Sequence, residues 1–169
     1  MSLYWIDRPG PGRIAIMARP RAGDWLADEV AGWRANGVDI VVSLLEPDEV
    51  CELDLKDEPA MCAMERIDFQ TFPIPDRGTP STAEAKQLAQ RLAARIDDGC
   101  SIAIHCRAGI GRSSVIAALV LIVLGDPPAE VFGRISAARR LQVPDTEAQQ
   151  AWVLSVADEF AQARHGQLK

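Results

Sequence analysis

The chain has 169 residues, of which 48% are hydrophobic and 25% are charged, and its formal net charge at pH 7 is −6. This length suits a single domain over residues 1–169 that buries a substantial core, and the composition excludes a disordered or collagen-like chain. The negative charge argues against general binding to nucleic acid or to an anionic membrane, so we expect no nucleic-acid partner and no stable membrane association.

Strands and helices alternate along the first part of the chain. Residues 14–17 are predicted to form a short strand, and residues 24–36 have the spacing of an amphipathic helix. The β-branched apolar run at 38–45 predicts a strand that is buried on both faces. The apolar side of the helix would carry Trp25, Val30 and Trp33.

The middle of the chain has weaker signals. One or two short helices are expected between residues 46 and 66, and a strand is expected at 69–74, followed by a loop at 75–80. The next helix is predicted to begin with a capping box from Ser81 to Glu84 and to end at residues 98–99. Its apolar side would carry Ala85, Leu88, Leu92 and Ile96.

The last part of the chain is predicted to be mainly helical. A strand at 101–105 precedes a helix at 112–124. Asp126-Pro127-Pro128 is expected to open a further helix that runs to about residue 140, and a final helix covers roughly 146–163. Strands that alternate with helices indicate the α/β class, so we expect a central, mostly parallel sheet flanked by helices.

The terminal sequence and the cysteines favour a cytoplasmic protein. Residues 1–17 contain no continuous apolar segment after a basic start, so no secretory signal is predicted. The four cysteines are irregularly spaced, which favours reduced thiols, and they lack the spacing of a structural zinc site. The longest apolar run, residues 115–124, is too short to cross a bilayer. We expect neither a metal nor a cofactor.

The segment HCRAGIGRS, residues 105–113, interrupts two apolar stretches and is the strongest candidate for a functional site. It joins a predicted strand to a predicted helix, where the free backbone N–H groups of a helix N-terminus bind anions. Gly109 and Gly111 permit tight turns and keep side chains out of the cavity. Arg112 adds a planar fork of donors for phosphate oxygens, and Cys106 would place its sulfur at the centre.

A nucleophilic cysteine has to be a thiolate, which sets an energetic requirement. An unperturbed thiol has a pKa of about 8.5, and lowering it to about 5 takes roughly 4–5 kcal/mol at ~1.4 kcal/mol per unit. A helix dipole supplies about 0.3–2 kcal/mol, so loop amides, Arg112 and the Ser113 hydroxyl would have to supply the rest. The alternative, a buried structural cysteine beside a helix-capping arginine, is disfavoured because the composite H-C-x5-R-S pattern is rare by chance.

The complete H-C-x5-R-S signature at 105–113 resembles that of the cysteine-dependent protein tyrosine and dual-specificity phosphatases. The resemblance extends over most of the chain, because PIPDRGTPS at 73–81 precedes the signature at the usual distance and DTEAQ at 145–149 follows it. Size and order are similar to those of the compact dual-specificity group. The loop at 73–81 is similar to that of the kinase-associated phosphatase.

This resemblance implies a two-step phosphoryl transfer. The Cys106 thiolate would attack phosphorus, while Asp76 would protonate the leaving oxygen and then act as base on the hydrolytic water. A turn-forming role is the alternative for Asp76. Asp68 is its main rival as the acid, whereas Asp97 and Asp98 are expected to end a helix.

The resemblance also assigns supporting roles. Ser113 would assist expulsion of the thiolate or only cap the helix, and His105 would order the loop through its ring nitrogens. Arg107 would either face solvent or attract anionic substrates. The phosphate-binding residues would be Arg107, Ala108, Gly109, Ile110, Gly111 and Arg112.

One departure from the family concerns the Q-T-x-x-Q pattern whose glutamines order the hydrolytic water. Asp145 replaces the first glutamine, and it is equally consistent with an N-cap of the last helix, whereas Gln149 retains the second glutamine position. Cys51, Cys62 and Cys100 are expected to be core or surface thiols. Cys51 and Cys62 are also candidates to protect Cys106 by forming a disulfide.

The leading functional hypothesis is a metal-independent phosphatase that acts on phosphotyrosine, and also on phosphoserine or phosphothreonine, in proteins. The alternatives are a phosphoinositide phosphatase and a non-catalytic phosphoprotein-binding module. Ile110 departs from the second basic loop residue common in inositide enzymes, and degenerate members usually lose the nucleophile or the arginine, which this chain keeps. Sulfur transfer and arsenate reduction also use loop cysteines, but neither requires an acid such as Asp76. The physiological substrate and the oligomeric state are not encoded in these motifs.

Overall fold

The computed structural model describes the backbone of residues 2–166 and the side chains of residues 2–160, so the extreme ends of the predicted 1–169 domain lie outside the described residues. The strands are β1 Tyr4–Ile6, β2 Arg13–Ala18, β3 Ile40–Ser43, β4 Asp68–Thr71 and β5 Ser101–Cys106. The helices are α1 Leu26–Ala35, α2 Pro47–Glu52, α3 Glu58–Met64, α4 Thr82–Asp97, α5 Arg112–Val123, α6 Val131–Arg139 and α7 Glu147–Gly166. A 3-10 turn, Gly23–Trp25, precedes α1.

A five-stranded sheet in the order β1-β2-β5-β3-β4 forms the centre of the molecule. β2, β5, β3 and β4 run parallel to one another, which confirms the predicted α/β class and the mostly parallel sheet. β1 pairs with β2 in the antiparallel direction and was not predicted from the sequence. Its three residues precede a Pro/Gly-rich stretch and are too few to show a period of two.

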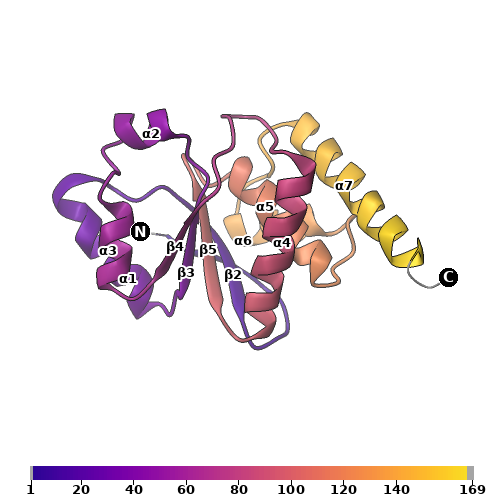
Figure 1. Ribbon diagram of the computed structural model, residues 1–169, viewed down its shortest axis with the longest axis horizontal. Coiled ribbons are helices and arrows are strands. Elements are labelled where there is room, and N and C mark those ends of the chain that lie inside the picture. Colours follow the sequence, from indigo (N-terminus) through magenta and orange to yellow (C-terminus); the bar gives the residue numbers. More distant parts are fainter. Residues whose placement is uncertain (1, 167–169) are drawn as a thin grey trace.

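Helices cover both faces of the sheet, as Figure 1 shows, with α1 and α3 on one side and α4 to α7 on the other. Side chains alternate between the two cores because successive strand residues point to opposite faces. On β2, Ile14 and Ile16 enter the core under α4 to α7, whereas Met17 enters the core shared with α1 and α3. All of β3 is buried, as its β-branched run predicts.

α5 is the most deeply buried helix and leads directly from the polar loop. Its residues from Arg112 to Ile122 are all buried, and it packs against α4, α6, α7 and the sheet. Each fully buried Leu, Ile or Val contributes about 1.5–3 kcal/mol relative to exposure, so the start of α5 is firmly anchored in the core. The loop at 107–111 therefore connects two rigid elements, β5 and α5.

Three local predictions are wrong. Trp25 is 55% exposed and stacks on Arg21, with the guanidinium carbon 4.4 Å from the ring centre, so it does not join the apolar side of α1. The Ser81 side chain makes no capping hydrogen bond at the start of α4. α6 begins at Val131 and not at Asp126. A residue that precedes proline disfavours the helical conformation, and residues 126 and 127 both precede a proline.

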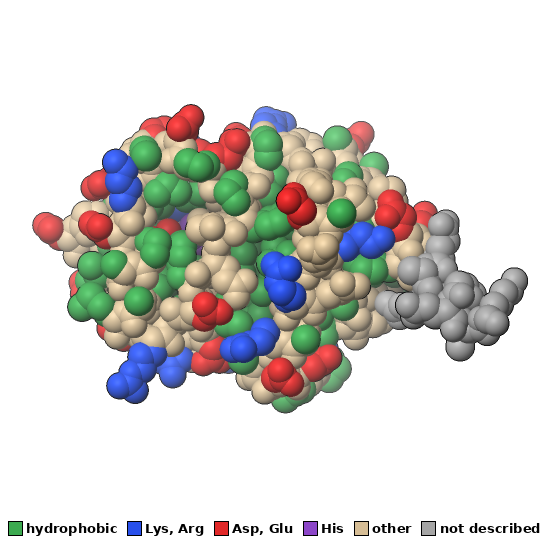
Figure 2. Space-filling view, in the orientation of Figure 1, with side chains coloured by type: hydrophobic (Ala, Val, Ile, Leu, Met, Phe, Trp, Pro, Cys, Tyr) green, Lys and Arg blue, Asp and Glu red, His purple; other side chains and the backbone are tan. Residues whose placement is uncertain are grey.

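The predicted apolar side of α4 is confirmed, because Ala85, Leu88, Leu92 and Ile96 are all buried. Figure 2 shows the opposite, exposed side of this helix with Lys and Arg side chains, while Asp and Glu side chains gather over α2. Within the described part of the chain, no helix is both long enough and apolar enough to cross a membrane.

Candidate active site

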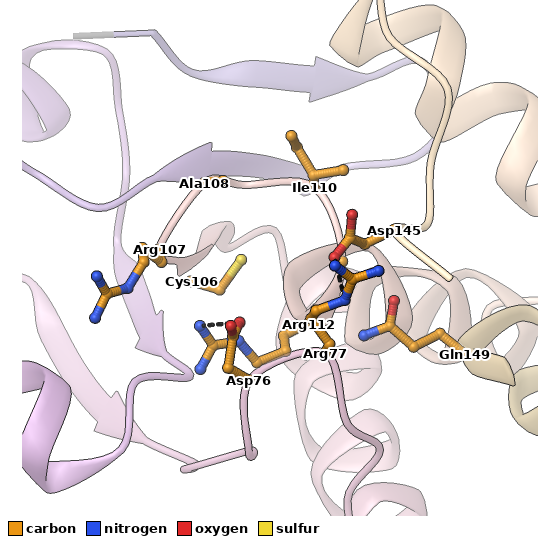
Figure 3. Close-up of a pocket in the computed structure, with 10 residues that line it drawn as sticks. Asp76, Arg77, Cys106, Arg107, Ala108, Ile110, Arg112, Asp145 and Gln149 are labelled. Atoms are coloured by element: carbon orange, nitrogen blue, oxygen red, sulfur yellow. Dashed lines mark ion pairs between the residues drawn. The ribbon is translucent and has the colours of Figure 1, made fainter. Parts of the chain in front are cut away.

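A cavity of about 250 Å³ lies at the carboxyl end of β5, where the loop at 107–111 leads into α5 (Figure 3). Most of the residues predicted for the site meet there, although they come from three separate parts of the chain. The lining residues are Asp76, Arg77, Cys106, Arg107, Ala108, Ile110, Gly111, Arg112, Asp145 and Gln149. The cavity is thus where a parallel α/β sheet is expected to bind a ligand.

Cys106 lies at the base of this cavity and is only 3% exposed. Its sulfur is 3.6 Å from the hydroxyl oxygen of Ser113, which is fully buried in the first turn of α5. A hydroxyl at this distance is able to donate a weak hydrogen bond to a thiolate. The start of α5 also presents the positive end of the helix dipole to this sulfur.

The loop is held in place from outside the cavity. Gly109 has φ +66°, and a Cβ there would lie 2.4 Å from the carbonyl carbon of Met17, so only glycine fits. Arg139 at the end of α6 donates from Nε to the Gly109 carbonyl (3.0 Å) and from Nη2 to the Ala108 carbonyl (3.3 Å). Because these carbonyls are bound on the outer side, the loop amides stay available for an anion.

Arg112 is 2% exposed and is fixed by a bidentate ion pair with Glu49 of α2. Its Nη1 is 2.6 Å from one carboxylate oxygen and its Nη2 is 2.9 Å from the other. Nη1 also donates to the Ile74 carbonyl at 3.0 Å. The hydrogen bonds from Arg112 lower the pKa of Glu49 to about 2, although burial opposes this change. Burial disfavours the charged form of Arg112, but the hydrogen bonds to Glu49 and the nearby Cys106 and Asp76 together outweigh burial and raise the pKa of Arg112 overall.

Glu49 was not predicted to belong to the site. It lies 63 residues before Arg112, and its only local signal is the start of α2, where Glu46 and Glu49 form a capping box around Pro47. That pattern predicts a helix N-terminus and gives no indication of a distant arginine.

Arg107 is half-exposed at the mouth of the cavity and is paired with two carboxylates of α2. Its Nε is 3.2 Å from Glu49, and its Nη2 is 2.7 Å from Glu52. The hydrogen bond to Glu52 is the main cause of the raised pKa of Arg107. Arg107 therefore does not simply face solvent. Its positive charge at the mouth of the cavity is largely compensated by Glu49 and Glu52.

Asp76 lies in the loop at 75–80, with its side chain 64% exposed and one carboxylate oxygen 3.2 Å from Nη2 of Arg112. Figure 3 shows its carboxylate beside the Arg112 guanidinium and turned toward the Cys106 sulfur. Asp68, its predicted rival, begins β4 at the opposite end of the strand and is not a lining residue. The structure therefore brings Asp76, and not Asp68, to the cavity.

Two contacts attach the Asp76 loop to the segment before α7. Arg77 Nε is 3.6 Å from an Asp145 carboxylate oxygen, and Gln149 Nε2 donates to the Gly78 carbonyl at 3.1 Å. The prediction that Asp145 is equally consistent with a helix N-cap is resolved against that role. Thr146 is the capping residue, because its hydroxyl accepts from the Gln149 amide nitrogen (3.2 Å) and its own N–H donates to Gln149 Oε1 (3.3 Å).

His105 is fully buried. The contact of its ring is with α3 and not with the loop at 107–111 that it was predicted to order. Its Nε2 lies 2.9 Å from Oε1 of Glu58, the first residue of α3. Cys62, one of the two candidates for a disulfide with Cys106, belongs to the other core. All four cysteines are free, and Cys62 lies in the core on the α1 and α3 side, where burial raises its pKa to about 12.

A comparison with protein families assigns the part of the chain that contains the loop at 107–111. The family model of the DSP-PTPase phosphatases of polymorphic toxin systems matches residues 15–126, which is more than half of the chain. The chain belongs to this family. It is therefore a cysteine-dependent phosphatase, as the H-C-x5-R-S signature predicts. The matched region includes Asp76 and the whole loop but ends before Asp145 and Gln149.

Curated relatives match over a short segment. The chain is 39% identical over 54 residues to cyclin-dependent kinase inhibitor 3 of Rattus norvegicus, and 37% identical over 54 residues to the Homo sapiens protein. These segments cover 32% of this chain and 26% of each relative. The chain thus spans about a quarter of the length of the curated relatives that it matches.

Solved structures share the fold over most of the chain. A kinase associated phosphatase with a serine in place of its catalytic-site cysteine has a TM-score of 0.80 at 18% identity, with 88% of each chain covered. A mutant form of Tk-PTP has a TM-score of 0.75 at 24% identity, covering 95% of this chain and 97% of that one. At these sequence identities, the structural similarity is evidence for a shared fold and for nothing more specific.

Proposed function

We propose that this phosphatase hydrolyses phosphotyrosine, and also phosphoserine or phosphothreonine, in proteins through a phosphocysteine intermediate on Cys106. The whole chain would act as one domain, in the cytoplasm, where its free thiols stay reduced. The observation that carries the proposal is the convergence of Cys106, Ser113, Arg112 and Asp76 on one cavity. These four groups supply a nucleophile, a hydrogen-bond donor to its sulfur, a phosphate-binding cation and an acid.

In the first step the Cys106 thiolate attacks phosphorus, so that the S–P bond forms as the P–O bond to the leaving group breaks. Asp76 transfers a proton to the departing oxygen. A phosphate dianion in the cavity would compete with Asp76 for Arg112, since that guanidinium lies 3.2 Å from the carboxylate. Substrate binding therefore releases the carboxyl group of Asp76 to carry the proton that the leaving oxygen needs.

In the second step water attacks phosphorus, the S–P bond breaks, and Asp76 accepts the proton of the water. The Ser113 hydroxyl stabilises the thiolate that leaves, because it is 3.6 Å from the sulfur and is held rigidly in α5. Gln149 has its amide committed to Thr146 and Gly78. We assign Gln149 the role of holding the Asp76 loop over the cavity. Gln149 also lines the cavity, next to the water that attacks phosphorus.

The depth of Cys106 favours phosphotyrosine as the preferred substrate. The sulfur lies at the base of the cavity and is almost inaccessible, so a long phosphorylated side chain reaches it more readily than a short one. A phosphoinositide phosphatase is the less favoured alternative. Arg107, the basic loop residue that an inositide headgroup would use, is already paired with Glu49 and Glu52.

The test is a panel of phosphotyrosyl, phosphothreonyl and phosphoseryl peptides and a soluble inositide phosphate, assayed by phosphate release. PTPMT1, which has the same fold at 18% identity, has been solved in complex with PI(5)P, so the inositide belongs in the panel. We expect the highest kcat/KM for phosphotyrosine. Cys106→Ser should abolish turnover while retaining vanadate binding. Preferred hydrolysis of the inositide, or turnover by the serine variant, would refute the proposal.

A further inference from the structure

A groove of about 720 Å³ runs along the β1 edge of the sheet and shares no lining residue with the catalytic cavity. It is lined by residues 2–5, by Asn36 at the end of α1 and by residues 138–140 at the end of α6. We call it the β1 groove. β1 is the outermost strand on this side of the sheet, so the groove follows a sheet edge.

The β1 edge has the features of a site that accepts another strand. Leu3 and Trp5 pack toward the core under α1 and α3, whereas Tyr4 packs toward the core under α4 to α7. The groove therefore includes both faces of the sheet edge. On the side of β1 that faces away from β2, the described residues make no hydrogen bond to the backbone. An unpaired edge of this kind binds an extended segment through main-chain hydrogen bonds.

The β1 groove is positively charged, although the chain as a whole carries a formal charge of −6. No carboxylate is among its described lining residues. Arg139 donates to carbonyls of the loop at 107–111, and Arg13 donates to the Ser101 hydroxyl (3.3 Å) and to the Asn36 carbonyl (3.0 Å). Arg140 is exposed at the end of α6 and has no partner among the described residues.

This lack of carboxylate partners distinguishes the three arginines of the groove from other arginines in the described part of the chain. An ion pair with Asp or Glu is formed by Arg21, Arg34, Arg77, Arg107, Arg112 and Arg134. The positive charge at the groove is therefore left uncompensated, and complementarity predicts an acidic ligand.

The aromatic rings of the groove favour an acidic polypeptide over a single-stranded nucleic acid. The guanidinium carbon of Arg139 lies 4.1 Å from the centre of the Tyr4 ring, and that of Arg13 lies 4.1 Å from the centre of the Trp5 ring. A stacked guanidinium still presents N–H donors at its edge to a carboxylate. Nucleic-acid bases need open aromatic faces for stacking, and here each ring has a face covered by an arginine.

On this basis we infer that the β1 groove docks an acidic, extended segment of the phosphoprotein substrate, which pairs with β1 as an added strand. This inference rests on the proposed function. Because Arg139 also binds the Ala108 and Gly109 carbonyls, the groove adjoins the outer side of the phosphate-binding loop. A docked segment keeps the phosphorylated residue of the same molecule near the cavity, which lowers KM and leaves the chemical step unchanged.

Binding is measured by fluorescence anisotropy with a labelled, unphosphorylated peptide of alternating glutamate and valine. A peptide with glutamine in place of glutamate tests the charge, and a glutamate peptide N-methylated at two adjacent central residues tests the strand pairing. We expect both changes to weaken binding. The double variant Arg13→Gln/Arg140→Gln should weaken binding of the glutamate peptide roughly 3- to 30-fold. Arg91→Gln/Arg95→Gln, which removes the same charge from the exposed side of α4, is the matched control and should bind like the wild type.

Steady-state kinetics test whether the docked segment belongs to the substrate. A phosphotyrosyl peptide is joined to the glutamate segment by a Gly/Ser linker of about 20 residues, whose root-mean-square length is about 25 Å. We expect its KM to be roughly 3- to 30-fold lower than that of the same peptide joined to the glutamine segment, with equal kcat. Arg13→Gln/Arg140→Gln should lose this difference and should hydrolyse a small aryl phosphate like the wild type.

These outcomes separate the inference from the proposed function. If no phosphotyrosyl peptide is hydrolysed, the proposed function fails, while the anisotropy assay still reports on the groove. Equal binding of the glutamate and glutamine peptides, or equal KM values for the two linked substrates, would overturn the inference alone. Undiminished binding of the N-methylated peptide would also overturn it, as would tighter binding of a labelled oligothymidylate than of the glutamate peptide.

Discussion

The ion pair between Glu49 and Arg112 is predicted to stabilise the fold as well as the site. The pKa of Glu49 is lowered from 4.5 to about 2, chiefly by its hydrogen bonds to Arg112, and its side chain is only 10% exposed. A difference of about 2.5 units corresponds to roughly 3 kcal/mol at ~1.4 kcal/mol per unit. Because the folded-state pKa is the lower one, this stability is fully present above pH 4.5 and is lost as the pH falls toward 2.

Glu49→Gln tests this reasoning, since glutamine at the third helical position still completes the capping box of α2. Urea unfolding at pH 7 should give a free energy of unfolding about 3 kcal/mol lower than the wild type, a shift of about 1–2 M in the midpoint. The difference should shrink as the pH is lowered from 5 toward 3. Glu52→Gln is the control, because Glu52 is exposed and its ion pair among the described residues is with Arg107. About 1.4 kcal/mol of the difference should remain at pH 3, because Glu49 is still mostly ionised in the folded protein at that pH. Equal stability of Glu49→Gln and wild type at pH 7, or a difference at pH 3 as large as at pH 7, would show that the ionised Glu49 does not supply this stability.

Three further predictions concern the chemistry and the loop. Asp76→Asn should lower kcat by about 10²–10⁴-fold, most strongly for poor leaving groups, and remove the alkaline limb of the pH–rate profile; an unchanged limb would place the acid elsewhere. Ser113→Ala should slow the second step by about 10–100-fold, through loss of a hydrogen bond to the charged sulfur, and produce a burst of product in stopped-flow assays; no burst would mean that Ser113 only caps α5. Gly109→Ala should lower the free energy of unfolding by about 2 kcal/mol or more, because its Cβ would meet the backbone of β2. Gly133→Ala, in an open part of α6, is the control and should raise it by up to ~1 kcal/mol; equal urea midpoints for the two would contradict the packing seen at Gly109.

The fold was largely predictable from sequence because periodicity and β-branched runs report burial directly. The strand at 38–45 and the apolar side of α4 are examples in which the pattern and the observed burial agree. The errors occur where local chemistry competes with packing. Trp25 stacks on Arg21 outside the core, and β1 is set by pairing with β2, which no local pattern encodes.

The site was predictable only where it is contiguous. The residues from Cys106 to Ser113 form one motif, so the nucleophile candidate, the loop and Arg112 were all identified. The groups that hold them come from distant segments: Glu49 binds Arg112, Arg139 binds the loop carbonyls, and Glu58 contacts His105. Each of these is an ordinary charged residue on a helix, and only the folded topology reveals its partner.

If Cys106 carries the phosphoryl group during turnover, the phosphocysteine can be trapped in acid. Wild type and Ser113→Ala are mixed with an aryl phosphate, quenched in acid within the first turnover and digested for peptide mass spectrometry. We expect the added mass of one phosphoryl group on the Cys106 peptide, with more of it in Ser113→Ala. Full turnover without any phosphorylated Cys106 peptide in either protein would show that Cys106 is not the nucleophile.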